Sequence, residues 1–196
     1  GLDAKGLVFL YAVPWPAQGL YSKKAINSVS DLKGLKFRAY NSATIRIAEL
    51  TGMAPTKIEA AEISQAFSTG AVESMITSPT TGKNSKIWEN GVGYFYDIAA
   101  WFPKNMVIVN KDAWNKLDSA TKKLVMSEAA VAEKKGWELS KKGNVADKKA
   151  LSDAGMKVGK VNSALEKHFQ KVGATMADEW KAKAGSRGAS VLAAYK

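Results

Sequence analysis

Arg38 is the side chain whose type and position most directly suggest ligand chemistry. It lies in residues 35–40, LKFRAY, where alternation places Arg38 and Tyr40 on one face of a predicted strand and Phe37 on the other. Lysine supplies most of the 29 cationic side chains, and arginine occurs at only three positions. A guanidinium is a planar fork that can donate two hydrogen bonds to one carboxylate. Arg38 is therefore a candidate carboxylate anchor, and a solvent-facing arginine is the alternative.

Three aromatic side chains next to prolines form a second group of candidates. Trp15 lies in the sequence Val-Pro-Trp-Pro, and Trp101 and Phe102 precede Pro103 between two extended runs. Residues 101–103 interrupt two extended runs, so this segment is predicted to be a place where the chain crosses between sheets or lobes. Aromatic rings at such places can bury the apolar part of a ligand, and packing in a core or hinge is the alternative.

Residue types that support covalent catalysis or metal binding are scarce. The chain has no cysteine and one histidine, so a catalytic triad or a histidine metal site would depend on His168 alone. His168 lies at helical spacing from apolar residues, which is typical of a structural histidine. No glycine-rich phosphate motif occurs. We therefore expect that the protein is not an enzyme and that it binds no metal or cofactor. A hydrolase or lyase that acts in the cleft of the candidate carboxylate anchor is the disfavoured alternative.

The net charge of +11 raises the question of a nucleic-acid partner. Most of this charge is lysine, mixed with acids at helical intervals, and no block of five or six like charges occurs. This distribution favours a solvated surface over a nucleic-acid face. Attraction of anionic solutes remains open, and a basic nucleic-acid or polyanion-binding protein is the alternative function.

Short extended and helical runs alternate over the first two-thirds of the chain. Strands are predicted at residues 35–40, 55–59, 73–77, 94–101 and 105–110, with helices after Asn41 and at about 61–69. Such alternation predicts βαβ units and a mostly parallel sheet. Because ligands bind beyond the carboxyl ends of parallel strands, the end of the strand that carries Arg38 is a predicted ligand site.

The last third is predicted to be mainly helical. One pattern covers residues 118–153, which is long for a globular helix, so it should break near Gly136 or Gly143 or span two lobes. A strand at 156–161 follows. No apolar run approaches the roughly 18–20 residues of a membrane-spanning helix.

Two further helices complete this prediction. A capping box at Ser163 opens the first, and Gly185 ends it. A short terminal helix is expected at residues 191–195.

Several motifs together resemble a known family. Residues 26–38, INSVSDLKGLKFR, are similar to its "I-x-S-x-x-D-l-K-G-l-K-x-R" run, and Gly52-x-x-Pro55, residues 61–66 and residues 69–73 also fit. The chain resembles the solute-binding subunits of TRAP (tripartite ATP-independent periplasmic) transporters, the DctP family. The similarity extends over nearly the whole chain.

The resemblance implies an α/β, periplasmic-binding-protein-like two-lobe flytrap, with mixed sheets flanked by helices and a long hinge-spanning helix. Most of the N-terminal lobe would be missing from this chain. The implied divisions are a remnant of that lobe with the hinge crossing (1–20), the second ligand-binding lobe (21–101), a return to the first lobe with the long helix (102–143), and a second-lobe strand with C-terminal helices (144–196).

The resemblance also assigns roles to individual residues. Arg38 falls on the signature arginine that grips the ligand carboxylate. Ser78 stands where relatives often carry a ligand-binding asparagine, and Gln18 stands where sialic-acid binders carry a second arginine. With Trp15, Trp101 and Phe102 flanking the cleft, these departures favour an apolar or aromatic monocarboxylate over a polyhydroxylated sugar acid.

The implied function is capture of a small organic acid in the bacterial periplasm and its delivery to the membrane permease subunits of a TRAP transporter. The implied protein is a monomer without cofactor or nucleic acid. The chain begins at Gly1 without an initiator methionine or a leader, so we expect it to be processed, trimmed or incomplete at its N-terminus. The resemblance implies removal of a signal peptide.

Overall fold

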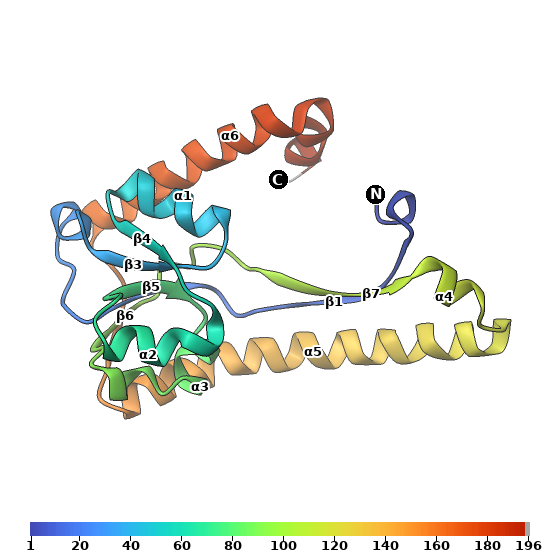
Figure 1. Ribbon diagram of the computed structural model, residues 1–196, viewed down its shortest axis with the longest axis horizontal. Coiled ribbons are helices and arrows are strands. Elements are labelled where there is room, and N and C mark those ends of the chain that lie inside the picture. Colours follow the sequence, from blue (N-terminus) through green and yellow to red (C-terminus); the bar gives the residue numbers. More distant parts are fainter. Residues whose placement is uncertain (195–196) are drawn as a thin grey trace.

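The computed structural model describes residues 1–194, except for the side chain of Arg187. A six-stranded sheet with its helices lies at one end, and a two-stranded ribbon beside a long helix extends from it (Figure 1). The strands are β1 Leu7–Pro14, β2 Gly19–Ser22, β3 Lys36–Ala39, β4 Ala54–Lys57, β5 Ser74–Thr77, β6 Tyr94–Tyr96, β7 Lys104–Asn110 and β8 Lys157–Gly159. The α-helices are α1 Ser42–Thr51, α2 Ile63–Ser68, α3 Pro79–Asn84, α4 Lys111–Asn115, α5 Ser119–Asp153 and α6 Ser163–Ala194.

The six-stranded sheet has the order β4-β3-β5-β2-β6-β8. β3 is parallel to β4 and β5, β6 is parallel to β8, and β2 is antiparallel to both of its neighbours. The sheet is thus mixed, with parallel pairs on both sides of one reversed strand. Because β3 and β5 are parallel, Arg38 in β3 and Ser78 directly after β5 lie toward the same edge of the sheet.

Two apolar cores cover the two faces of this sheet. Leu20, Phe37 and Ile76 belong to one core, where residues of α1 and α6 also pack. Tyr21, Met75 and Phe95 belong to the other, with residues of α2 and the end of α5. Alternation along β2 and β5 sends successive side chains to opposite cores, so the sheet is buried on both faces.

Helix α1 forms where the sequence predicts it. Asn41 caps it, because its Oδ1 accepts a hydrogen bond from the Thr44 amide at 2.8 Å. Gly52 ends it in a left-handed conformation, φ 76°. The helix therefore begins at Ser42, four residues after Arg38.

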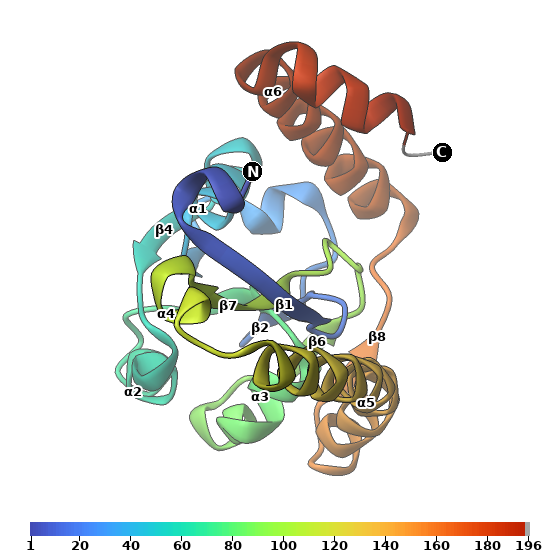
Figure 2. The ribbon, with the colours of Figure 1, turned by 90° about the vertical axis from the view of Figure 1, so that its right-hand side faces the viewer.

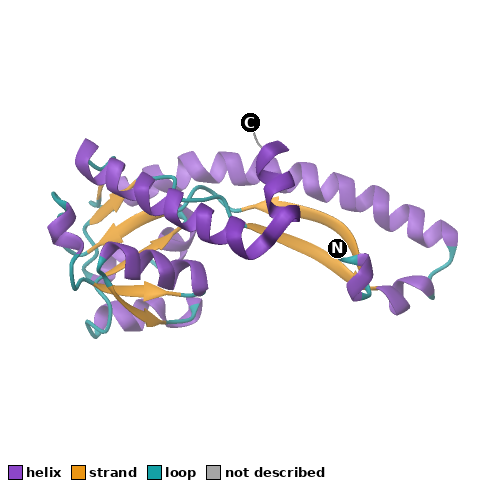
Figure 3. Cartoon of the chain, turned by 90° about the horizontal axis from the view of Figure 1, so that it is seen from above, coloured by secondary structure: helices purple, strands orange, loops and turns teal. Residues whose placement is uncertain are grey.

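The ribbon pairs β1 with β7 in antiparallel register, with an irregularity between Phe9 and Tyr11. Helix α5 packs along much of the length of β1 (Figure 3). The break expected near Gly136 or Gly143 is absent, because α5 is continuous from Ser119 to Asp153. Gly136 instead allows close approach: an added Cβ would lie 3.0 Å from Val13 Cγ1 and nearer still to Cγ2.

The chain crosses between ribbon and sheet twice, and the two crossings are hydrogen-bonded to each other. The Trp15 amide donates to Pro103 O at 2.7 Å, and the Gln18 amide donates to Trp101 O at 3.1 Å. The strand predicted at residues 94–101 is therefore shorter than expected. After Tyr96 the chain leaves the sheet, and Ala99 adopts a positive φ of 45°.

Helix α6 lies above α1 and the sheet, on the side opposite α5 (Figure 2). Asn162, rather than the predicted Ser163, caps it, because Asn162 Oδ1 accepts from the Leu165 amide at 3.0 Å. Gly185 breaks the helical geometry as expected, φ 61° and ψ −150°. The predicted terminal helix extends to Tyr195, which is outside the described residues. No helix within residues 1–194 combines the length and apolar character needed to span a membrane.

Candidate functional site

A small cavity lies where the crossings meet the edge of the sheet. Its volume is about 170 Å³, and it contains four of the six predicted ligand-binding residues. Its lining residues come from both crossings, from β3 and β5 and from the start of α3: Trp15, Gln18, Arg38, Tyr40, Ala60, Thr77, Ser78, Thr81 and Pro103. The edge of the sheet thus contributes one wall, and the two crossings contribute the other.

Arg38 is held in this cavity by two contacts that leave its outer nitrogens available. The residue is 4% exposed. Its Nε donates to the Ile58 carbonyl at 2.9 Å, and its Cζ lies 4.6 Å from the centroid of the Tyr40 ring. Among residues 1–194, no carboxylate lies within ion-pair distance of Arg38. A buried cation therefore faces the cavity without an ion-pair partner among these residues.

The electrostatic environment of Arg38 favours an incoming anion. Burial lowers the pKa of Arg38, while Tyr40 and Glu59 act in the opposite direction. Burial also raises the pKa of Tyr40, opposed by the neighbouring Trp101 and Arg38, so the phenol stays neutral near pH 7. Desolvation makes a positive charge costly unless it is paired. An organic anion in the cavity would supply that missing partner.

Ser78 is fixed at the start of α3. Its Oγ accepts from the Thr81 amide at 3.0 Å, and its carbonyl accepts from the Tyr21 hydroxyl at 3.0 Å. Burial raises the pKa of Tyr21 well above its ordinary value, with a further contribution from Asp147. Tyr21 therefore remains a donor, and Ser78 forms a rigid part of the cavity wall.

Gln18 and Trp15 come from the first crossing. Gln18 is buried, and its side-chain amide donates to the Pro16 carbonyl at 2.9 Å. Trp15 is 37% exposed at the cavity. The crossing thus contributes one amide and one indole opposite Arg38 and Ser78.

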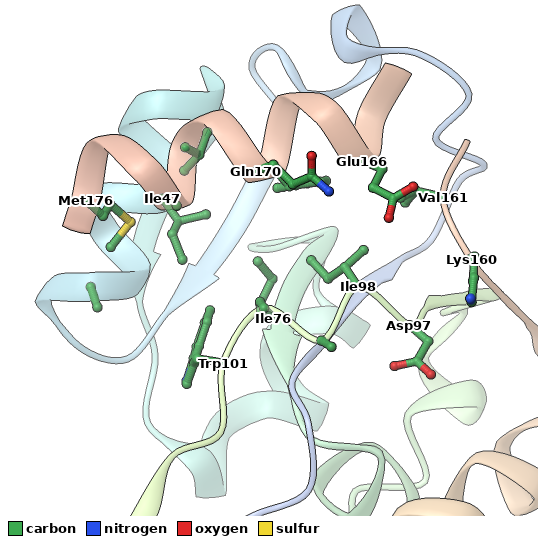
Figure 4. Close-up of a pocket in the computed structure, with 16 residues that line it drawn as sticks. Ile47, Ile76, Asp97, Ile98, Trp101, Lys160, Val161, Glu166, Gln170 and Met176 are labelled. Atoms are coloured by element: carbon green, nitrogen blue, oxygen red, sulfur yellow. The ribbon is translucent and has the colours of Figure 1, made fainter. Parts of the chain in front are cut away.

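The other two predicted residues do not line the small cavity, although Trp101 neighbours the Tyr40 hydroxyl. Trp101 lines a larger cavity of about 750 Å³ on the opposite face of the sheet, beneath α6. Figure 4 shows Trp101, Ile47 and Met176 toward one end of this cavity and Asp97, Lys160 and Glu166 toward the other. Phe102 is 66% exposed and lines neither cavity. The structure therefore does not bring all three predicted aromatic residues together.

Five cavity residues were not singled out as ligand-binding from the sequence. The signal for Tyr40 was present, because it shares the face of Arg38. Thr77 is adjacent to Ser78, and Thr81 lies one helical turn beyond it. No local pattern marks the remaining two, Ala60 and Pro103, because tertiary packing brings them to the cavity.

Metal ligands do not gather in the part of the chain that the structure describes: no group of three or more His, Asp or Glu side chains is placed to hold an ion. His168 lies on α6, and its Nε2 is buried without a hydrogen-bond partner. It is not among the residues that line the small cavity.

Comparison with known proteins places these features in context. The model of the DctP family, "Bacterial extracellular solute-binding protein, family 7", matches residues 3–183. A solute-binding protein of Albidiferax ferrireducens is 27% identical over 183 residues, which are 92% of this chain and 53% of that protein. The chain therefore spans about half the length of this curated relative.

Two solved structures share almost the entire fold of the chain. One is DctP6 of Bordetella pertussis, an extracytoplasmic solute receptor that binds pyroglutamic acid, with 41% identity and a TM-score of 0.95. The other is a TRAP solute-binding protein from a marine metagenome, specific for pyroglutamate, with 38% identity and a TM-score of 0.94. Each match covers 99% of this chain and 64% of the other protein.

Proposed function

Because this chain belongs to the DctP family of bacterial extracellular solute-binding proteins, we propose that it captures a small organic acid for a TRAP transporter. Arg38 is the proposed anchor for the ligand carboxylate. The observation that carries this proposal is the buried Arg38 guanidinium, which faces a cavity without an acidic partner among the described residues.

The energetics require more than this one contact. A hydrogen bond to a charged group contributes about 1.5–3 kcal/mol, whereas micromolar affinity corresponds to about 8 kcal/mol. Two bonds from Arg38 would supply much of the specificity. Apolar contact with Trp15 and Tyr40 and polar contact with Gln18, Thr77 or Thr81 would supply the remainder.

Pyroglutamate is the first ligand we propose. Two relatives about 40% identical to this chain bind it. It is a compact monocarboxylate with a cyclic amide, which suits a cavity of about 170 Å³ that offers one cation and several hydroxyl and amide groups.

The proposed mechanism is closure of the two cavity walls around the ligand. Arg38 and Ser78 belong to the sheet side, which we assign to residues 21–101, whereas Trp15 and Gln18 belong to the crossing within residues 1–20. A ligand that contacts both walls stabilises the closed arrangement relative to the open one. The bacterial periplasm, permease subunits as partners and a monomeric state are parts of the same proposal.

Titration with two matched compounds tests it. L-Pyroglutamate should bind and raise the thermal midpoint, with a stabilisation of about 2.7 kcal/mol at a hundred times its dissociation constant. 2-Pyrrolidinone, which has the ring but lacks the carboxylate, should do neither. Equal binding of both compounds would contradict the carboxylate anchor. Salt-sensitive retention on heparin or DNA, without binding of any acid, would favour the polyanion-binding alternative.

A further inference from the structure

Asp147 is a buried acid that the proposed ligand contacts do not use. It lies on α5 and is 5% exposed. Its Oδ2 accepts from the Thr80 hydroxyl at 2.6 Å, and its Oδ1 accepts from the Lys83 ammonium at 2.9 Å. Both partners belong to α3, so one carboxylate joins the short helix to the long one.

Helix α3 is held from its other side by the sheet. The Tyr21 hydroxyl donates to the Ser78 carbonyl at 3.0 Å. Gly82 packs so closely against this ring that an added Cβ would lie 2.7 Å from Tyr21 Cε1 and nearer still to the hydroxyl. The first turn of α3 is thus fixed between Tyr21 and Asp147, and this turn carries Ser78 and Thr81 into the cavity wall.

The same long helix also contacts β1, the strand that leads to the opposite wall. Glu133 Oε1 accepts from the Ala12 amide at 3.1 Å, and Trp137 Nε1 donates to the Ala12 carbonyl at 3.0 Å. Ala12 lies on β1, three residues before Trp15. At a rise of about 1.5 Å per residue, the ten residues from Trp137 to Asp147 span about 15 Å. One continuous helix therefore connects both walls of the site.

From these contacts we propose that Asp147 is a positioning residue for ligand binding, which rests on the proposed function. It holds the Ser78–Thr81 turn against α5 and so fixes that turn relative to Trp15. It acts through Thr80 and Lys83 without contact with the ligand. Arg38 supplies the attraction, and Asp147 keeps the Ser78–Thr81 turn in place for contact with the bound acid.

Pyroglutamate titration of variants of the full chain tests this proposal. Asp147→Ala should weaken binding by about fivefold or more. Leu165→Ala is the matched control, because Leu165 is buried in the core on the other face of the sheet and makes no contact with α3. It should lower the thermal midpoint and leave affinity within about twofold when measured well below that midpoint. Equal losses of affinity in both variants would overturn the positioning role.

Rescue by a second variant separates positioning from general loss of structure. In Asp147→Asn, the amide oxygen still accepts from Thr80 but Lys83 loses its counter-charge, so affinity should fall. Adding Lys83→Met removes the unpaired charge and should restore most of the affinity. Failure of this restoration would contradict the proposed arrangement.

The amide signals of Ser78 and Thr81 in the ligand-free protein provide a readout that needs no ligand. Asp147→Ala should shift both signals in a nitrogen–proton correlation spectrum, and Leu165→Ala should not. If the unmodified chain fails to bind pyroglutamate, the ligand proposal fails while these shifts still decide the role of Asp147. Unshifted signals in Asp147→Ala would refute that role.

Discussion

The guanidinium of Arg38 lies over the ring of Tyr40, with Cζ 4.6 Å from the ring centroid. Both residues are on the same face at the end of β3, and Arg38 Nε donates to the Ile58 carbonyl. In the proposed site, this ring would restrict the guanidinium and orient its outer nitrogens before a ligand arrives. Preorganisation of this kind strengthens binding because less freedom is lost on association.

Replacement of Tyr40 tests this preorganisation. A cation–π contact contributes about 0.5–2 kcal/mol, so Tyr40→Leu should weaken pyroglutamate binding by about twofold to thirtyfold. Tyr40→Phe keeps the ring and should keep the affinity within about twofold. Titration calorimetry of the two variants measures the difference. A phenylalanine variant as weak as the leucine variant would show that the hydroxyl, not the ring, matters.

The second prediction concerns stability and follows from the position of Gly136, which lies where α5 meets β1. Alanine normally stabilises a helix relative to glycine by about 0.5–1 kcal/mol. At position 136, however, the added methyl group would collide with the stiff, β-branched Val13. Gly136→Ala should therefore lower the free energy of unfolding by about 1–3 kcal/mol.

Gly173 provides the control for this substitution. It lies in α6, and no heavy atom is within 4 Å of an added Cβ. Gly173→Ala should raise the thermal midpoint while Gly136→Ala lowers it. A higher thermal midpoint in both variants would refute the close packing between α5 and β1.

Asp31 predicts a pH dependence of stability. Its Oδ2 accepts from the amides of Asn27 and Ser28 at 2.8 and 2.9 Å, and these hydrogen bonds, with one from the Ser28 side chain, lower its pKa below the ordinary 3.8. A carboxyl whose pKa is lower in the folded state stabilises that state above its unfolded pKa. The contribution is lost as the pH falls through the folded pKa.

The measurement is the urea midpoint between about pH 6 and about pH 2. Asp31→Asn should lower the midpoint at pH 6 and reduce its fall below about pH 4. Asp178→Asn removes an exposed carboxylate that accepts no hydrogen bond among the described residues, and it should leave the profile unchanged. Identical acid profiles for Asp31→Asn and the parent would contradict the assignment.

Local patterns in the sequence predicted the elements that carry Arg38. Alternation in residues 35–40 predicted both the strand and the shared face of Arg38 and Tyr40. Asn41 and Gly52 marked the limits of α1 because capping depends on side chains within one turn of the helix end. Features that depend on residues close together in the sequence could therefore be predicted without coordinates.

Features that depend on residues far apart in the sequence could not be predicted in this way. Gly136 predicted a break because glycine weakens an isolated helix, whereas in the structure it accommodates Val13 from β1. Trp101 and Phe102 were grouped with Trp15 because they flank a crossing. In the structure, the Trp101 side chain lines the larger cavity, whereas the Phe102 side chain is exposed to solvent. Asp147 gave no sequence signal, because its partners are more than sixty residues away.

The affinity of Arg38→Lys for pyroglutamate tests the central claim most directly. Lysine keeps the charge but loses the planar pair of donors and the stacking on Tyr40. Arg46→Lys is the matched control, since Arg46 lies on α1 and pairs with Glu49 and Glu179 at the surface. We predict a loss of at least about tenfold for Arg38→Lys and no change for Arg46→Lys. Undiminished binding by a folded Arg38→Lys protein would contradict the account.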